Sequence, residues 1–157
     1  MVVDSSVLIP LLRIGKLELL FECFKDIVVP EAVWQEVVID GKELGKVFSA
    51  IEENTNKFKI IKFDERLPKI NGLQDNDLKI LATAKTQNDI LLTNDATLYE
   101  AALSQSIKAW WLTALILYAV KIKKLSPEEG KVIALELVNA GAYLKSDVLA
   151  QVLFALD

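Results

Sequence analysis

Short apolar segments that alternate with helical patterns constrain the fold of this chain more than any other feature. Strands are predicted where short runs are mostly apolar, at 1–3, 27–29, 58–63 and 90–93, with 107–109 as a fifth short strand. Helical spacing lies between them, at 6–12, 16–24, 30–38, 43–54, 75–86 and 96–104, with Asp40–Gly41 ending the third of these helices. Such βαβ units place helices on both faces of a sheet. The sequence therefore predicts an α/β fold, a three-layer α/β/α sandwich around a mainly parallel sheet of four or five strands.

The C-terminal part of the chain is predicted to be entirely helical. Helices are expected over 112–122, 126–141 and 147–156, and the second begins at the capping sequence "SPEE". No repeat or low-complexity linker interrupts the chain, so we expect a single domain over 1–157, of which about 112–157 is a C-terminal helical region. The last two helices carry apolar stripes that fit either a core or a dimer face, formed by Val132, Leu135, Leu137, Val138, Val148, Leu149, Val152 and Leu153.

The composition limits where the protein can be located and which catalytic sites it can contain. The hydrophobic fraction is 52%, yet no run reaches the roughly 18 uncharged apolar residues that span a membrane. The N-terminus has no basic stretch followed by a cleavage site, and Cys23 is the only cysteine, so a cytoplasmic protein without a disulfide framework is expected. The chain has no histidine, which excludes a Ser-His-Asp triad and His-rich zinc sites. The net charge of −4 argues against binding nucleic acid through bulk charge.

Carboxylates fall where a parallel sheet would gather them. Asp4 directly follows the first strand, and Asp95 follows Thr93 at the end of the fourth. In open α/β sheets ligands bind beyond the carboxyl ends of the strands. Glu36 lies on the helix after the second strand, and Asp77 in the first turns of the helix before the fourth. Oxygen ligands without histidine or thiolate favour Mg²⁺ or Mn²⁺, which would also relieve repulsion among the acids.

Each of these acids also has a purely structural interpretation. Asp4 and Asp95 are preferred N-cap residues for the helices that follow them. Asp77 suits the positive end of a helix, and Glu36 suits an exposed helix surface. Position and periodicity alone leave these alternatives open beside a metal site.

Four segments in order, "VVDSSVLIPLLRIGKLELL", "VVPEAVWQEVV", "DNDLKILATA" and "ILLTNDATLY", resemble the PIN-domain nucleases. The likeness is closest to small prokaryotic, toxin-like members with a C-terminal helical extension. It implies a metal-dependent endoribonuclease that hydrolyses RNA phosphodiester bonds with Mg²⁺ or Mn²⁺. By motif position, the resemblance assigns the catalytic and metal-binding acids to Asp4, Glu36, Asp77 and Asp95. It assigns Ser6 and Thr93 to small polar residues that support the carboxylates, and Asp75 to an extra acid.

The resemblance also implies partners. RNA is the expected substrate, an antitoxin protein that covers the cleft is an expected partner, and a homodimer is expected because PIN domains often pair. The alternative from another class is a non-catalytic PIN-like module that binds RNA or protein, although the intact set of four acids speaks against it. A phosphatase of the haloacid type would need D-x-D after the first strand, where this chain has "DSS". A flap nuclease would usually need more acids and a larger helical arch.

Overall fold

The centre of the fold is a five-stranded sheet in the order β3-β2-β1-β4-β5. It is seen in a computed structural model that describes residues 1–44 and 55–157. All four neighbouring strand pairs are parallel. The strands are β1 (Val2–Val3), β2 (Ile27–Pro30), β3 (Phe58–Ile61), β4 (Leu91–Thr93) and β5 (Ala109–Trp111). The α/β prediction is confirmed, and the sheet is entirely rather than mainly parallel.

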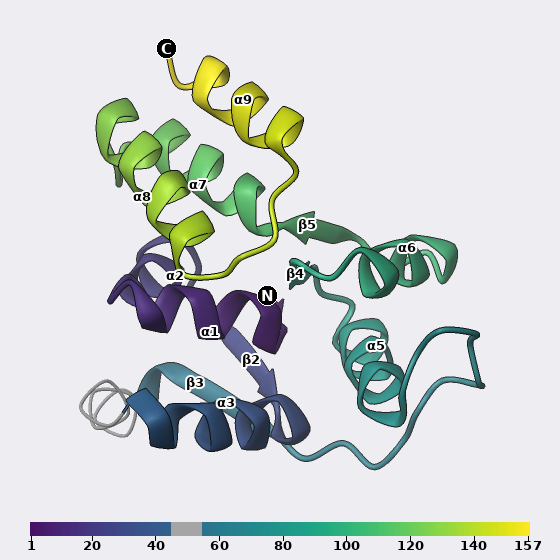
Figure 1. Cartoon of the computed structure of the whole chain (residues 1–157). Helices are drawn as coiled ribbons and strands as arrows, with labels where there is room; N and C mark the ends of the chain where they lie inside the picture. Colours follow the sequence, from purple (N-terminus) through teal and green to yellow (C-terminus); the bar gives the residue numbers. More distant parts are fainter. Residues whose placement is uncertain (45–54) are drawn as a thin grey trace.

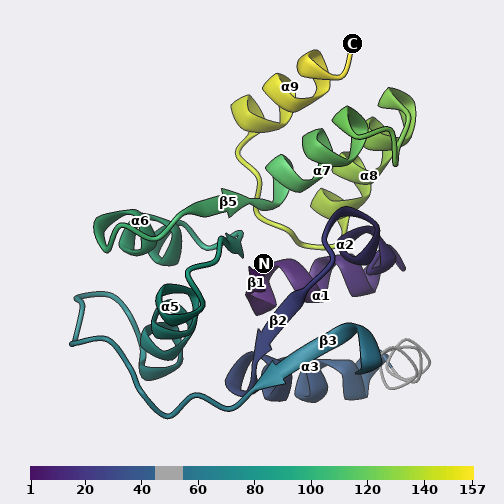
Figure 2. The ribbon, with the colours of Figure 1, turned by 180° about the vertical axis from the view of Figure 1, so that it is seen from behind.

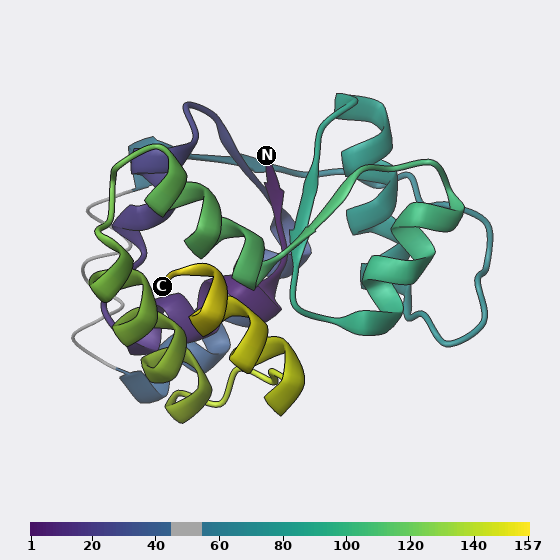
Figure 3. The ribbon, with the colours of Figure 1, turned by 90° about the horizontal axis from the view of Figure 1, so that it is seen from above.

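Helices cover both faces of this sheet, as parallel strands require. In the described part of the chain they are α1 (Ser5–Arg13), α2 (Glu18–Cys23), α3 (Glu31–Leu44), α5 (Asp75–Gln87), α6 (Ala96–Ser104), α7 (Leu112–Lys121), α8 (Pro127–Asn139) and α9 (Ser146–Ala155), with a 3₁₀ turn at Thr55–Lys57. Figure 1 labels these elements, and Figure 2 shows β2 and β3 beside α3 from behind. Figure 3 shows α5 and α6 on one side of the strands and the C-terminal helices on the other. The predicted three layers are therefore present.

The strand order places the switch point of the sheet between β1 and β4. From β1 the chain builds toward β2 and β3, whereas β4 leads to β5 on the opposite side. The register is set by Val2 beside Leu91 and Val3 beside Leu92, all four fully buried. The segments after β1 and β4 therefore emerge together at the carboxyl edge, where open α/β sheets bind ligands.

Two predicted element boundaries are wrong. The helix that begins after β2 does not end at Asp40–Gly41, because α3 continues to Leu44. A glycine inside a helix costs only about 1 kcal/mol relative to alanine, and the rest of the helix supplies more than that. The fifth strand lies at Ala109–Trp111 rather than at 107–109, since Thr93 pairs with Trp111. The helix expected over 43–54 lies mostly outside the described residues.

The C-terminal helices extend the core rather than standing apart from it. On their apolar stripes, Leu137 and Val152 are buried, whereas Val132 and Leu135 are exposed at 53% and 46%. The predicted capping box is present, since Ser126 Oγ accepts from the Glu129 amide at 3.2 Å and Glu129 Oε2 from the Ser126 amide at 2.8 Å. No helix in the described ranges is long and apolar enough to cross a membrane.

Gly130 on α8 gives a test of this packing. A Cβ there would meet Val120 Cγ2 at 2.9 Å and Leu156 Cδ1 at 3.2 Å, so α8 touches α7 and the C-terminal end through a glycine. We expect Gly130→Val to lower the free energy of unfolding by about 2 kcal/mol through overpacking. Urea denaturation followed by circular dichroism measures this. Glu136→Val, on the exposed side of the same helix, is the control, and equal losses in the two variants would contradict the close packing.

Candidate functional site

The chain leaves the carboxyl ends of β1 and β4 with an aspartate at each. The Asp4 amide donates to the Leu92 carbonyl at 3.1 Å, so Asp4 still belongs to the edge of the sheet. Asp95 follows β4 after one intervening residue, Asn94. Because β1 and β4 are parallel neighbours, both side chains start from the same edge, as predicted.

Asp4 is a buried carboxylate held by hydroxyl groups. Its Oδ2 accepts from the Thr93 hydroxyl at 3.0 Å, from the Ser6 hydroxyl, and from the Ser6 amide at 3.3 Å. Its Oδ1 accepts only a long bond, 3.4 Å, from the Ser5 hydroxyl within the described residues. Burial raises the pKa of Asp4 above its ordinary range, although the bonds from Ser6 and Thr93 oppose the rise. The side chain is thus fixed through one oxygen, and the other is weakly engaged.

Ser6 and Thr93 form one small network around this carboxylate. Their hydroxyl oxygens lie 3.3 Å apart, so they contact each other as well as Asp4. Ser6 Oγ also accepts from the Asn94 amide at 2.8 Å, and Thr93 Oγ1 accepts from the Asp95 amide at 3.1 Å. The two hydroxyls therefore join the segments after β1 and β4. Thr93 supports Asp95 through its backbone rather than through its carboxylate.

Asp95, Asp77 and Glu36 approach from three different helices. Asp95 caps α6, because its Oδ1 accepts from the Leu98 amide at 2.8 Å, and its side chain is exposed. Asp77 lies in the first turn of α5, where its Oδ2 accepts from the Gln74 amide at 2.8 Å. Loss of solvent raises the pKa of Asp77, and the charges of Asp95 and Glu36 raise it further. The charges of Asp95 and Glu36 thus act on Asp77.

One cavity of about 400 Å³ brings the four acids together. Asp4, Glu36, Asp77 and Asp95 all line it, and Ser6 and Asn94 lie among them. The structural interpretation is also correct for two of them, since Asp4 and Asp95 cap helices. The capping bonds use one oxygen of each carboxylate, so capping and ligand binding are compatible. The four acids named from the sequence therefore line one cavity, and their assignment as a metal site stays a prediction.

The chemistry of this cavity fits a divalent cation. Four carboxylates supply hard oxygen donors, and Asn94 Oδ1 is a buried acceptor with no hydrogen-bond partner among the described residues. Within residues 1–44 and 55–157, however, no three Asp, Glu or Cys side chains lie close enough to enclose one ion. Like charges repel, so carboxylates without an ion between them stand apart. Magnesium commonly keeps several waters and takes only one or two carboxylates directly, so wider spacing suits it.

Asp75 is not brought into this cavity. Its carboxylate forms an ion pair with Arg66, and both side chains are more than half exposed. It lines a different cavity, beside Pro68 and Leu73. On a helix, residues two apart face different directions, so Asp75 points away from Asp77 as their spacing indicates.

Asn76, Asn94 and the segment 140–145 were not singled out from the sequence. Asn76 donates from Nδ2 to Glu36 Oε1 at 3.3 Å and so links α5 to α3. Asn94 donates from Nδ2 to the Tyr143 carbonyl at 3.0 Å, and Arg13 Nη1 donates to the Ala140 carbonyl at 3.2 Å. The bonds from Asn94 and Arg13 hold the α8–α9 connection, 140–145, against the acidic cavity. No sequence pattern shows that a loop so distant along the chain forms one wall; its only local sign is the aromatic Tyr143 after Gly141.

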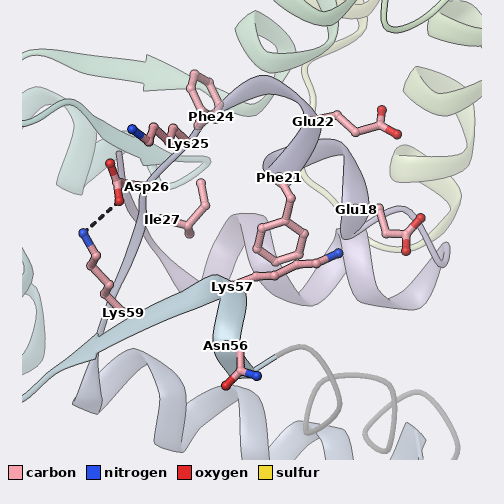
Figure 4. A pocket seen from close by; sticks show the side chains of 10 residues that line it. All are labelled: Glu18, Phe21, Glu22, Phe24, Lys25, Asp26, Ile27, Asn56, Lys57 and Lys59. Atoms are coloured by element: carbon pink, nitrogen blue, oxygen red, sulfur yellow. Dashed lines mark hydrogen bonds and ion pairs between the residues drawn. The ribbon is translucent and has the colours of Figure 1, made fainter.

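A larger cavity, of about 520 Å³, lies at the opposite end of the strands, before β2 and β3 (Figure 4). There Lys59 Nζ forms an ion pair with Asp26 at 2.8 Å. Lys57 Nζ lies 5.1 Å from the centre of the Phe21 ring, within cation–π range. The lining of this larger cavity contains both acidic and basic side chains, and one pair of them forms an ion pair. Of these two cavities, only the one at the carboxyl ends of the strands gathers the four acids.

Cys23 is not suited to act as a nucleophile. Burial raises the pKa of its thiol to about 11, and the neighbouring Glu22 adds to the rise. We expect iodoacetamide at pH 8 to alkylate Cys23 about 100-fold more slowly in the folded protein than in urea, because the thiolate is the reactive form. Mass spectrometry against time measures both rates. Equal rates in the two conditions would show that the thiol is exposed and ordinary.

The fold and the acidic cavity define a PIN-like α/β protein, and the family comparison agrees. A PIN-domain family model (DUF3368) matches residues 1–157, so the chain belongs to the PIN-domain family. This family generally includes nucleases and is typically metal-dependent. The resemblance inferred from the four sequence segments is thereby confirmed at the level of the family.

One solved structure supports the fold. A PilT N-terminus domain protein from the hyperthermophilic archaeon Sulfolobus solfataricus P2 aligns with a TM-score of 0.55 and 17% identity, over 73% of this chain and 88% of that one. At that identity the likeness concerns the fold alone. A domain of a functionally unknown protein from Methanocaldococcus jannaschii DSM 2661 is 29% identical, with a TM-score of 0.46, over 70% of this chain and 88% of that one. No curated protein matches the chain.

Proposed function

We propose that this protein is a metal-dependent endoribonuclease that hydrolyses RNA phosphodiester bonds. The observation that carries the proposal is the convergence of Asp4, Glu36, Asp77 and Asp95 in one cavity at the switch point of the sheet. Membership of the PIN-domain family supports it, since that family generally includes nucleases. Mg²⁺ or Mn²⁺ is the proposed cofactor because the donors are hard oxygens and the chain has no histidine.

The proposed roles follow from how each carboxylate is held. Asp4, Asp77 and Asp95 would bind the ion, with Glu36 binding it directly or through water. Asp4 and Asp95 each use one oxygen for a local hydrogen-bond network or cap, which orients the other. When bound, the ion activates water and stabilises negative charge on phosphoryl oxygens. Ser6 and Thr93 support this arrangement by keeping the Asp4 side chain in one position.

Among the described residues, the lining of the acidic cavity has no histidine, lysine or cysteine to assist covalent catalysis. Histidine is absent, and Cys23 does not line the acidic cavity. Ser5 and Ser6 lie there, but no histidine or lysine of the cavity lining could take up their protons. Direct attack by water is therefore the proposed route. Arg13 is the cationic residue of the described lining and would contact RNA phosphate.

A fluorogenic RNA oligonucleotide tests the proposed function. We expect cleavage by the wild-type protein with Mg²⁺ or Mn²⁺ and none with EDTA. Calorimetry with Mn²⁺ reports on the metal site independently of the substrate. Cleavage that persists in EDTA would overturn the metal-dependent mechanism, and a matched DNA oligonucleotide cleaved equally well would overturn the assignment to RNA.

A non-catalytic PIN-like module that binds RNA or protein is the alternative. The separation of the carboxylates favours it, since no three acids of the described residues enclose an ion as they stand. The same calorimetry separates the two functions. Absence of Mn²⁺ binding together with absence of cleavage would select the binding module and leave Asp4 as a helix cap.

The proposed partners follow from the same assignment. Small prokaryotic PIN proteins include toxins, so we propose an antitoxin that covers the acidic cavity as one partner. A homodimer is the second, and the exposed Val132 and Leu135 on α8 are available apolar contacts for it. Light scattering at tens of micromolar measures the mass, and a monomer would remove the dimer from the proposal.

A further inference from the structure

A second cavity lies directly beside the acidic one. Its volume is about 300 Å³, and its lining is largely apolar, with Trp111, Leu144 and Val148. Asn94 and Tyr143 line both cavities, so the two are contiguous. A polymer whose backbone phosphate lies among the carboxylates would therefore have a neighbouring group at this second cavity.

Two aromatic residues, Trp111 and Tyr143, line this second cavity. Trp111 stacks on Tyr99 with ring centres 4.2 Å apart and planes 22° apart, which fixes its position. Tyr143 is 74% exposed, and its ring makes no aromatic contact within the described residues. Asn94 Nδ2 binds the Tyr143 carbonyl at 3.0 Å, so the backbone that carries this ring is anchored at the boundary between the two cavities.

The charges of the lining select the kind of ligand. Glu100 and Lys145 contribute one charge of each sign, and Thr113 adds a hydroxyl-bearing side chain. Such a lining does not favour a phosphate, which prefers clustered cations or convergent amides. It favours a neutral, planar, polar-edged group, because aromatic side chains stack on nucleobases while polar groups bind their edges.

We propose that this second cavity binds a nucleobase of the RNA next to the phosphate that is cleaved, with Tyr143 as its stacking platform. The proposal rests on the proposed function of the acidic cavity and adds the contact that selects single-stranded, base-bearing substrate. It also gives a role to the α8–α9 connection, which carries Tyr143, Leu144 and Lys145 to the site. Tyr143 is a binding residue here and takes no part in the chemistry.

Tyr143→Ala, Tyr143→Phe and Phe154→Ala test the proposal. Phe154 is the matched control, because it is 80% exposed on α9 and lines neither cavity. Substrates are a fluorogenic RNA and a series in which one nucleotide near the cleavage position is abasic. We expect Tyr143→Ala to raise KM for the intact RNA by about 5- to 150-fold, the range for loss of one stacked base. Tyr143→Phe should restore it, and Phe154→Ala should match the wild type.

The abasic series distinguishes stacking from a structural role. At one position, removal of the base should raise the wild-type KM by a similar factor, and Tyr143→Ala should then add little. A Tyr143→Ala effect of equal size on every abasic substrate would overturn the proposal while leaving the nuclease assignment intact.

Binding without catalysis gives an independent readout. Tryptophan fluorescence in EDTA follows binding of a four-nucleotide RNA when nothing is cleaved. Quenching by the intact RNA that is weakened by Tyr143→Ala and by the abasic substitution would support the nucleobase site even if no metal supports cleavage. Equal quenching by intact and abasic RNA would overturn it.

Discussion

We expect the Asp4→Asn variant to lose metal-dependent RNA cleavage by at least about 10³-fold in kcat, because a catalytic metal supplies several kcal/mol and each 1.36 kcal/mol is tenfold in rate. Asparagine keeps the size of the side chain, and its carbonyl oxygen can still accept from Thr93 and Ser6. What it lacks is the charge and the second anionic oxygen. Cleavage of the fluorogenic RNA at saturating Mg²⁺ measures the loss.

The fold of this variant should remain intact. Asp4 is 6% exposed, so replacing its carboxylate removes a charge from a buried position and relieves repulsion among the acids. Its melting temperature without metal should therefore equal or exceed that of the wild type at pH 7.5. Asp75→Asn is the control, because Asp75 lies outside the acidic cavity in an exposed ion pair with Arg66. Full activity of the Asp4→Asn variant would refute the proposed mechanism.

Metal binding and pH should both change the stability of the folded protein through the acids of the cavity. Burial raises the pKa of Asp4, and loss of solvent followed by the charges of Asp95 and Glu36 raises that of Asp77. The folded protein therefore holds protons that the unfolded chain, with carboxyl pKa values near 3.8, has released. Stability from these two groups is complete below the unfolded value and is lost as the pH rises through the folded values.

We expect the melting temperature in EDTA to rise as the pH is lowered from 7.5 to 5. Below about pH 4 the trend should reverse, because Asp26 and Glu129 have lowered pKa values and their stabilising contacts are then lost. At pH 7.5, Mn²⁺ at about 100 times its Kd should contribute about 2.7 kcal/mol. That corresponds to a rise of about 5–10 °C for a chain of this size.

Differential scanning calorimetry with and without Mn²⁺ measures these shifts. The Asp4→Asn variant is the control, since it should show a weaker pH dependence in EDTA and a smaller response to Mn²⁺. A wild-type protein that is most stable at pH 7.5 in EDTA, and that Mn²⁺ does not stabilise, would show that these acids do not form a metal site.

The sequence predicted the layers and the acids for a common reason. Strand runs such as Leu91–Thr93 are buried on both faces, and parallel pairing brings the residues that follow them to one edge of the sheet. Asp4 and Asp95 are thus placed by local sequence and simple topology. Glu36 and Asp77 were candidates by position, but their roles required the motif resemblance, because a helix position alone does not show which way a side chain faces. Their convergence became visible only in the packed fold.

The rest depended on contacts between distant segments. Tyr143 lies 49 residues after Asn94, to which its carbonyl is bonded, and no periodic pattern records such a bond. The shift of β5 to Ala109–Trp111 has the same origin, since pairing with β4 decides the register and the two tryptophans resemble the start of the next helix. The continuation of α3 through Gly41 shows that one residue of low helix propensity does not by itself end a helix.

The bonds from Arg13 to Ala140 and from Asn94 to Tyr143 have a consequence for how the chain could be shortened. They tie the α8–α9 connection to residues of the acidic cavity that lie much earlier in the chain. A protein ending after α8 would retain Asp4, Glu36, Asp77 and Asp95 but lose the tyrosine-bearing rim beside them. Such a protein would keep the proposed metal-binding acids and Arg13, but it would lack the proposed stacking contact of Tyr143.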